Sequence, residues 1–291
     1  MILTLQDGDL TVRVSPQGGA LVDGYCQGVP FLRPAPVGEG VVEDILQAAS
    51  FPLVPFGNRL GGNKFAVGGQ TYHLPPNTTG NPLYLHGDGW LATWTVVSAD
   101  EKDIRLSYVH PADGQSPYAY EAQQHIRLQD GALILDLSVT NRGDAALHFG
   151  LGHHPYFPRT PQTRLLAPAG VMWSEQPDHL PGAPAALPPD LDFHAAKLLP
   201  DRWVNNAFDG WDGMARIEWP ERELAVVIDT DASLRHYMLY LPTDDTDFFC
   251  FEPMSHLPNG HHLPGLGGLV LLVPGESVAG RMRLQPQRLD L

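Results

Sequence analysis

A histidine in a glycine-flanked apolar segment is the first candidate for proton-transfer chemistry. The segment Gly150-Leu151-Gly152-His153-His154-Pro155-Tyr156-Phe157 follows a strand-like run. In an extended chain the side chains of His154 and Tyr156 share one face and that of His153 points to the other. Pro155 favours an extended backbone at His154. One imidazole of the pair therefore faces any pocket on this segment, unless both histidines lie on the surface.

A glutamate at the end of an apolar strand is the second candidate. Glu252 closes the run Asp247-Phe248-Phe249-Cys250-Phe251-Glu252 and precedes Pro253. Partial desolvation among such neighbours raises the pKa of a carboxyl group toward the range of a general base. The alternative is a glutamate that leaves the sheet for water.

Two further segments could supply ligand contacts. An apolar stretch, residues 51–62, contains the pair Asn58-Arg59 between glycines. The guanidinium of Arg59 could bind sugar hydroxyls or a carboxylate, or donate to loop carbonyls. In His86-Gly87-Asp88-Gly89-Trp90, the glycines allow the backbone to approach a ligand closely. Trp90 could offer a stacking face, but this segment alone favours a buried histidine beside a core tryptophan.

Taken in chain order, these motifs resemble the aldose 1-epimerase (galactose mutarotase-like) family. The resemblance rests on Asn58-Arg59, His86-Gly87, His154-x-Tyr156-Phe157 and Glu252-Pro253, with residues 203–213 as a further landmark. It implies an all-β chain that folds as one β-supersandwich domain over residues 1–291. It also implies an isomerase, a mutarotase that interconverts the α and β anomers of a free hexose such as glucose or galactose without a cofactor or a metal.

The resemblance assigns roles to individual residues. His154 matches the general acid of the family and Glu252 its general base. Asn205 stands where many members carry a sugar-binding aspartate, and Asp209 or Asp212 could compensate for that difference. The expected substrate-binding residues are Arg59, His86, Asn205, Asn58 and Tyr156.

Anomer exchange requires the ring C–O bond to open and to close on the other carbonyl face. A carboxylate that removes the O1 proton while an imidazolium protonates the ring oxygen avoids two high-energy charges in one step. We expect the negative charge of Glu252 to raise the pKa of His154, and burial to raise that of Glu252. These shifts predict a bell-shaped rate profile with its plateau near neutral pH.

Alternating polar and apolar residues predict that strands position these groups. The 30 Gly and 28 Pro interrupt the chain too often for long helices. Gly68-Gly69 and Asp130-Gly131 predict hairpin turns. The predicted strands are 10–14, 64–67, 70–74, 93–97, 104–109, 120–128, 132–140, 224–229, 236–241, 247–252, 269–273 and 280–284.

The Pro-rich segment 174–202 could be a linker between domains or a long surface excursion. Because β character is the same on both sides, we expect an excursion that borders the functional site.

Composition excludes several classes of protein. The 291 residues carry a formal charge of -15, which disfavours nucleic acid and anionic membranes as partners. Cys26 and Cys250 lie far apart without metal-ligand spacing, and the N-terminus lacks a signal peptide. We therefore expect a cytoplasmic monomer or homodimer whose partner is a small monosaccharide.

Three rival functions remain open. A hexose-6-phosphate 1-epimerase would need more cations than Arg59, Lys64 and Arg159, so a neutral sugar is favoured. A non-catalytic carbohydrate-binding sandwich would not need the acid–base pair. A metal-dependent enzyme is suggested by the 13 histidines, but adjacent histidines on a strand point to opposite faces and chelate poorly.

Overall fold

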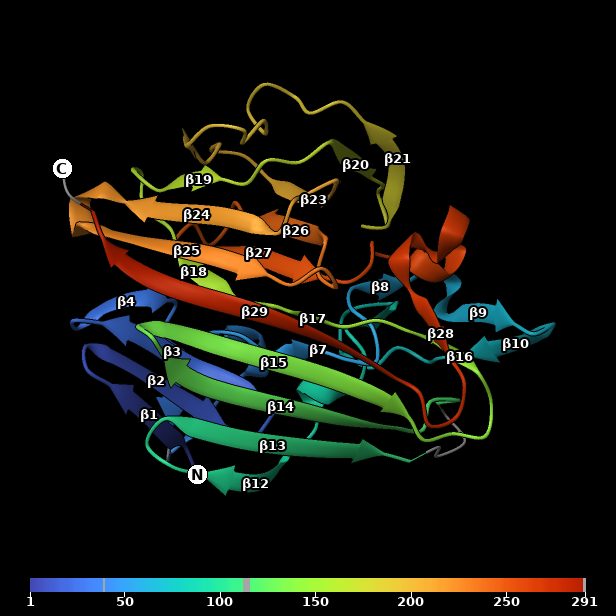
Figure 1. Ribbon diagram of the computed structural model, residues 1–291. Coiled ribbons are helices and arrows are strands. Elements are labelled where there is room, and N and C mark those ends of the chain that lie inside the picture. The colour runs from blue at the N-terminus through green and yellow to red at the C-terminus, as the bar shows by residue number, and fades with distance from the viewer. Residues whose placement is uncertain (39, 112–115, 290–291) are drawn as a thin grey trace.

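The computed structural model describes residues 1–38, 40–111 and 116–289, and its elements are strands and short 3-10 helices (Figure 1). This confirms the all-β prediction. Every pairing between two described strands is antiparallel, as expected from hairpins with short turns. Among the described residues, no helix has the length and apolar character needed to cross a membrane.

A nine-stranded sheet contains the longest strands of the molecule. The predicted hairpin at Asp130-Gly131 is present, since Gln129 pairs with Ala132. Four of these strands, β13, β14, β15 and β29, lie side by side in Figure 1. In spatial order the sheet comprises β12 (Thr95–Ala99), β13 (Asp103–His110), β14 (Tyr120–Gln129), β15 (Ala132–Asn141), β29 (Ser277–Arg288), β25 (Leu224–Thr230), β24 (Met214–Trp219), β19 (Arg164–Leu166) and β22 (Lys197–Leu198).

An eight-stranded sheet positions most of the candidate site residues. Its long central pair is β26 with β27, and β18 joins it by pairing with β27. In spatial order its strands are β21 (Pro181–Ala185), β20 (Val171–Glu175), β23 (Val204–Asp209), β26 (His236–Leu241), β27 (Phe248–Met254), β17 (Gly152–His153) and β7 (Pro52–Leu53), with β18 (Tyr156–Pro158) beside β27.

The remaining elements are smaller. A four-stranded N-terminal sheet contains β1 (Leu3–Asp7), β2 (Leu10–Ser15), β3 (Ala20–Cys26) and β4 (Val29–Leu32). Two-stranded pairs are β5 (Val37–Gly38) with β6 (Val41–Val42), β8 (Arg59–Leu60) with β11 (Tyr84–Leu85), β9 (Lys64–Val67) with β10 (Gln70–His73), and β16 (Leu147–Phe149) with β28 (Val270–Leu272). The 3-10 helices are η1 (Ile45–Gln47), η2 (Gly61–Asn63), η3 (Gly89–Leu91), η4 (Pro220–Arg222), η5 (Gly260–His262) and η6 (Pro264–Gly268).

Side-chain alternation in β27 separates the core from the candidate site. Phe249 and Phe251 are fully buried in the main apolar cluster, which also contains Leu135 and Leu284 of the nine-stranded sheet. Burying each phenylalanine contributes roughly 1.5–3 kcal/mol. A slip of one residue would move Glu252 into that core, so the two aromatic residues fix the register that points the carboxyl group the other way.

Two predictions for the segments around the candidate site are wrong. The strand predicted at 247–252 is β27, which continues past Glu252 through Pro253, so the carboxyl group lies inside a strand rather than at its end. The segment 174–202 is not only an excursion, because it contains β21 and β22. Pro181 and Pro184 are tolerated in β21 because that strand lies at the edge of its sheet, where a missing N–H group leaves no ladder bond unmade.

Candidate active site

One cavity of about 340 Å³ brings the predicted site residues together. Its walls come from β27, β23, β26 and the segments around β8, β11 and β18. All seven residues predicted from the sequence line it, and six further residues complete the lining. The lining consists of Leu46, Asn58, Arg59, Leu85, His86, His154, Tyr156, His179, Trp203, Asn205, Tyr240, Phe248 and Glu252.

The imidazole of His154 and the carboxyl group of Glu252 meet in this cavity. Nε2 of His154 lies 3.3 Å from Oε1 of Glu252, and the two residues are 6% and 3% exposed. Pairing of β17 and β18 with β27 brings the two segments together. The second carboxyl oxygen, Oε2 of Glu252, has no hydrogen-bond partner within the described residues. An unpartnered buried oxygen is costly to a fold, so the site is arranged for a ligand rather than for stability.

Aromatic packing fixes the plane of the His154 ring. Phe51 stacks on it with 4.6 Å between ring centroids, and Tyr156 stacks on it at 4.8 Å. The ring of His86 meets it edge-on at 5.0 Å. His153 is also buried but does not line the cavity. The predicted division of the two adjacent histidines between opposite faces is therefore confirmed.

Burial shifts the two pKa values in opposite directions. Loss of solvation raises the pKa of Glu252 to about 8, although the positive charge of Arg59 opposes this shift. Loss of solvation lowers the pKa of His154 to about 3. The expected rise at Glu252 is confirmed and the expected rise at His154 is wrong, because desolvation of the imidazolium outweighs the attraction of a carboxyl group that is itself protonated. At neutral pH the proton that the pair can exchange therefore lies on the carboxyl group of Glu252.

His86 presents a hydrogen-bond donor to the cavity. Its Nδ1 accepts the backbone N–H of Asn58 at 3.1 Å, so the ring proton must sit on Nε2. Burial, with the charges of His154 and Arg59, lowers the pKa of His86 well below its ordinary value, so the ring is neutral. The side-chain oxygen of Asn58 accepts the N–H of Arg59 at 2.8 Å. Asn58 therefore shapes the loop that carries the neighbouring ligand-binding groups.

Arg59 is the cation of the cavity wall. Burial lowers its pKa, and the negative charges of Glu252 and Glu175 oppose that shift. Its side chain makes no hydrogen bond to any carbonyl or side chain in the described part of the structure, which rules out the alternative of a loop-bonding arginine there. The five donors of the guanidinium are left for a ligand.

Sequence reasoning missed the aromatic residues at the mouth of the cavity. Trp203 is 37% exposed and meets the ring of Tyr240 edge-on at 5.3 Å. Of the two alternatives for Trp90, the core tryptophan is confirmed, because it is 1% exposed and its Nε1 donates to the carbonyl of Gly87 at 3.0 Å. Reading residues 203–209 as a strand would have put Trp203 and Asn205 on one face.

The carboxylate beside Asn205 comes from an unexpected position. Nδ2 of Asn205 donates to Oε1 of Glu175 at 2.6 Å. Asp209 instead faces His236 at 3.1 Å, and Asp212 accepts the backbone N–H of Met214. Neither aspartate lines the cavity, so neither supplies the compensation that the sequence left open.

One set of side chains in the described residues has the spacing of a metal site. Ligand atoms of His154, Cys250 and Glu252 lie within 4.8 Å of one another. The sequence did not indicate this set because Cys250 lies in β27 and His154 lies between β17 and β18, far away in the chain. Burial raises the pKa of the Cys250 thiol well above its ordinary value, which opposes the thiolate that a metal requires. The expected absence of a metal stays a prediction.

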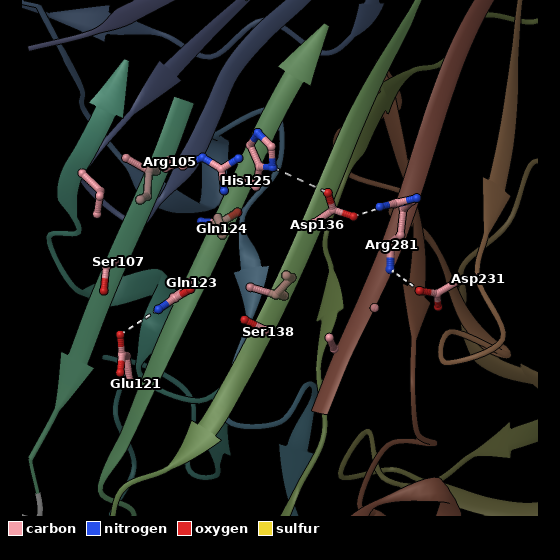
Figure 2. Close-up of a pocket in the computed structure, with 15 residues that line it drawn as sticks. Arg105, Ser107, Glu121, Gln123, Gln124, His125, Asp136, Ser138, Asp231 and Arg281 are labelled. Carbon is pink, nitrogen blue, oxygen red and sulfur yellow. Dashed lines mark hydrogen bonds and ion pairs between the residues drawn. The ribbon is translucent and has the colours of Figure 1, made fainter. Parts of the chain in front are cut away.

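A larger cavity of about 640 Å³ lies across β13, β14, β15 and β29, and Figure 2 shows its charged side chains. Asp136 pairs with Arg127 and, at 2.5 Å, with Arg281. His125 pairs with Asp103. Because neighbouring charges satisfy these groups, this surface presents no acid–base pair comparable to His154 and Glu252.

Comparison with known proteins agrees with the geometry. The aldose 1-epimerase family profile matches residues 1–285. The chain is 43% identical over 291 residues to the uncharacterized protein YphB of Escherichia coli strain K12, with 98% of each protein covered. It superposes with a TM-score of 0.93 and 42% identity on the crystal structure of a provisionally assigned aldose 1-epimerase from Escherichia coli K12, covering 99% of both chains.

A more distant structure shares the fold. A galactose mutarotase-like protein from Clostridium acetobutylicum has a TM-score of 0.86 at 19% identity, with 98% of this chain and 95% of that chain covered. Together with the match along nearly the whole sequence, these likenesses establish that the chain has the galactose mutarotase-like fold and belongs to the aldose 1-epimerase family.

Proposed function

We propose that the protein is a mutarotase that interconverts the α and β anomers of a free hexose such as glucose or galactose. The observation that carries this proposal is the 3.3 Å approach of His154 Nε2 to Glu252 Oε1 in a cavity lined by hydrogen-bonding groups. Membership of the family supports the class of reaction.

The reaction needs one proton removed and one delivered. Glu252, as carboxylate, takes the proton from the O1 hydroxyl, and the O1–C1 bond becomes a carbonyl. The C1–ring oxygen bond breaks, its electron pair goes to the ring oxygen, and His154 as imidazolium protonates that oxygen. After rotation about C1–C2 the same transfers run in reverse, so atoms and charges balance without a cofactor.

The pair reaches its reactive form when the shared proton moves from Glu252 to His154. Both forms carry the same total number of protons, so pH does not choose between them. Sugar hydroxyls that donate to Glu252, together with the positive charge of Arg59, stabilise the carboxylate. The Nε2–H of His86 and the guanidinium of Arg59 hold the sugar oxygens near the pair.

The phosphorylated-sugar alternative lacks the cations it needs. Arg59 is the one Lys or Arg among the lining residues. Arg159 lines a different cavity, beside Asp201 at 3.6 Å, and Lys64 lies exposed on β9. Both were counted from the sequence as neighbours of the pocket, and that placement is wrong. A neutral hexose is therefore the better fit.

A purely sugar-binding sandwich would have no need of a buried histidine and glutamate. Burying these two groups destabilises the fold, and a protein that only binds sugar would not use them. This observation favours an enzyme over the binding module.

Polarimetry of freshly dissolved α-D-glucose, α-D-galactose and glucose 6-phosphate tests the proposal. We expect the purified protein to accelerate equilibration of at least one free hexose well above the spontaneous rate, and to act weakly on the phosphate. Binding of the sugars without acceleration would identify the binding module, and preferential action on glucose 6-phosphate would identify the phosphate epimerase.

A further inference from the structure

The carboxylate of Glu175 forms hydrogen bonds with three side chains that line the cavity. It ends strand β20, and its side chain is 18% exposed. Its Oε2 accepts the indole Nε1–H of Trp203 at 2.7 Å. Its Oε1 accepts from Nδ2 of Asn205 at 2.6 Å and lies 2.6 Å from Nδ1 of His179. Glu175 itself is absent from the lining, so it acts on the cavity through these neighbours.

The carboxylate decides which way the Asn205 amide faces. A carboxylate only accepts hydrogen bonds, so Asn205 must turn its NH₂ group toward Glu175. Its carbonyl oxygen Oδ1 is then left for the cavity as an acceptor. The bond to Nε1 of Trp203 likewise fixes the rotation of the indole ring, whose partly exposed face lies at the cavity mouth.

The charge of Glu175 also sets the field at the mouth. It is close enough to Arg59 to act on that guanidinium, as is Asp178. This side of the cavity therefore combines an acceptor oxygen, an aromatic face and a negative field. A neutral pyranose suits all three, since it donates hydroxyl protons and stacks its C–H face on an aromatic ring. A carboxylate or phosphate group at the same place is repelled.

We propose that Glu175 is a specificity-determining positioning residue, which orients Asn205 and Trp203 so that the cavity takes neutral aldopyranoses and rejects sugars with an anionic group at this end. This inference rests on the proposed function for the identity of the ligand. It explains how an asparagine replaces the aspartate common in the family, because Glu175 supplies the charge and Asn205 supplies the acceptor.

Exchanging the carboxylate at position 175 with the amide at position 205 tests the proposal. In Glu175→Gln, the new NH₂ group draws the Asn205 carbonyl toward itself, and the cavity receives a donor instead of an acceptor. In Asn205→Asp, two carboxylates face each other and repel. In the double variant, the carboxylate introduced at position 205 accepts from the new glutamine amide and again presents an acceptor to the sugar, so binding is restored.

The measurements are the Kd for D-galactose or D-glucose by calorimetry, the KM and kcat for mutarotation, and the Kd for D-glucuronate. We expect each single variant to raise Kd and KM about tenfold with kcat within about threefold, and the double variant to recover most of the loss. Glu175→Gln should also reduce the difference between the Kd for glucose and the Kd for glucuronate. Asp190→Asn, which removes the partner of Arg202 on the same segment, is the matched control and should change none of these values.

Two results would overturn the inference. One is unchanged sugar affinity in both single variants. The other is a double variant whose loss of binding free energy equals the sum of the losses in the two single variants. Because Kd is measured without turnover, a wild-type protein that binds hexose but does not accelerate mutarotation refutes the proposed function alone. A wild-type protein that binds no neutral hexose refutes both.

Discussion

The carboxyl group of Glu252 and the imidazole of His154 share one proton where bulk water has little access. Each residue is less than a tenth exposed, and Nε2 of His154 lies 3.3 Å from Oε1 of Glu252. Because burial disfavours both ions, the neutral pair is the resting state at pH 7. Catalysis at this site therefore depends on how a bound sugar redistributes that proton.

The pH dependence of kcat/KM follows from this shared proton. Above about pH 8, which is the raised pKa of Glu252, the carboxyl group loses the proton that it exchanges with His154. We expect kcat/KM to fall about tenfold per pH unit there and to stay level down through pH 5, since burial lowers the pKa of His154 to about 3. Stopped-flow polarimetry across pH 5–10 measures the profile. An acid limb near 6.5, the ordinary pKa of histidine, would contradict the buried pair.

At the scale of single residues, the sequence predicted which residues line the cavity better than it predicted their packing and pKa values. All seven residues taken from the family resemblance line the cavity. The pKa direction at His154 was missed because the stacking of Phe51 and Tyr156 around it comes from folding. Glu175 was missed because a glutamate in a Pro-rich segment has no local feature that marks it as a hydrogen-bond centre.

The turn after β11 is the element that positions His86. His86 and Gly87 both have positive φ, at 59° and 72°, and the backbone N–H groups of Asp88 and Gly89 donate to the carbonyl of Val54. A Cβ atom at position 87 would lie 2.1 Å from that carbonyl oxygen. Glycine is therefore required by close approach as well as by the left-handed backbone.

Gly87→Ala should displace this turn. Gly80→Ala is the matched control, because Gly80 has a φ of 84° but nothing lies within 4 Å of its added Cβ. We expect Gly87→Ala to be destabilised by about 1–3 kcal/mol more than the control, with a raised KM because His86 moves. Urea denaturation and mutarotation kinetics measure the two effects. Equal decreases in the free energy of unfolding of both variants would show that backbone strain alone matters at position 87.

At the scale of strands, hairpins were predictable and sheet order was not. The turns at Gly68-Gly69 and Asp130-Gly131 depend on local chemistry, and the strands that they join pair as expected. The pairing of β27 with β17 and β18 joins segments far apart in the chain, so no local pattern predicts it. Strand β21 was obscured by Pro181 and Pro184, and strand β22 by its length of two residues.

For the whole molecule, two large antiparallel sheets enclose the core and leave the cavity on the outer face of one. The phenylalanines at positions 249 and 251 of β27 point into the core, while Cys250 and Glu252 lie on the opposite face. A rigid sheet can thus hold a costly pair of desolvated ionisable groups in place. The sequence predicted the all-β class from its alternation, but the distance between His154 and Glu252 required the folded chain.

Removal of either member of the pair must leave the fold intact for a clear result. The pKa of Glu252 is raised in the folded state, so the stability that it contributes is lost as pH rises from about 4.5 to about 8. Glu252→Gln has no carboxyl group to ionise at this position, so its stability does not fall for this reason as pH rises. We therefore expect the variant to melt at the same temperature as the wild type or higher at pH 9, measured by circular dichroism.

The turnover of Glu252→Gln and His154→Asn, followed by polarimetry of α-D-galactose or α-D-glucose, tests the central claim most directly. Each variant should lose about 10²–10⁴-fold in kcat while KM changes by less than about threefold, because each removes a proton-transfer group and leaves the sugar contacts. Glu218→Gln, whose carboxylate pairs with Arg216 on the other sheet, should keep full activity. Turnover near the wild-type rate in a folded Glu252→Gln variant would contradict the account.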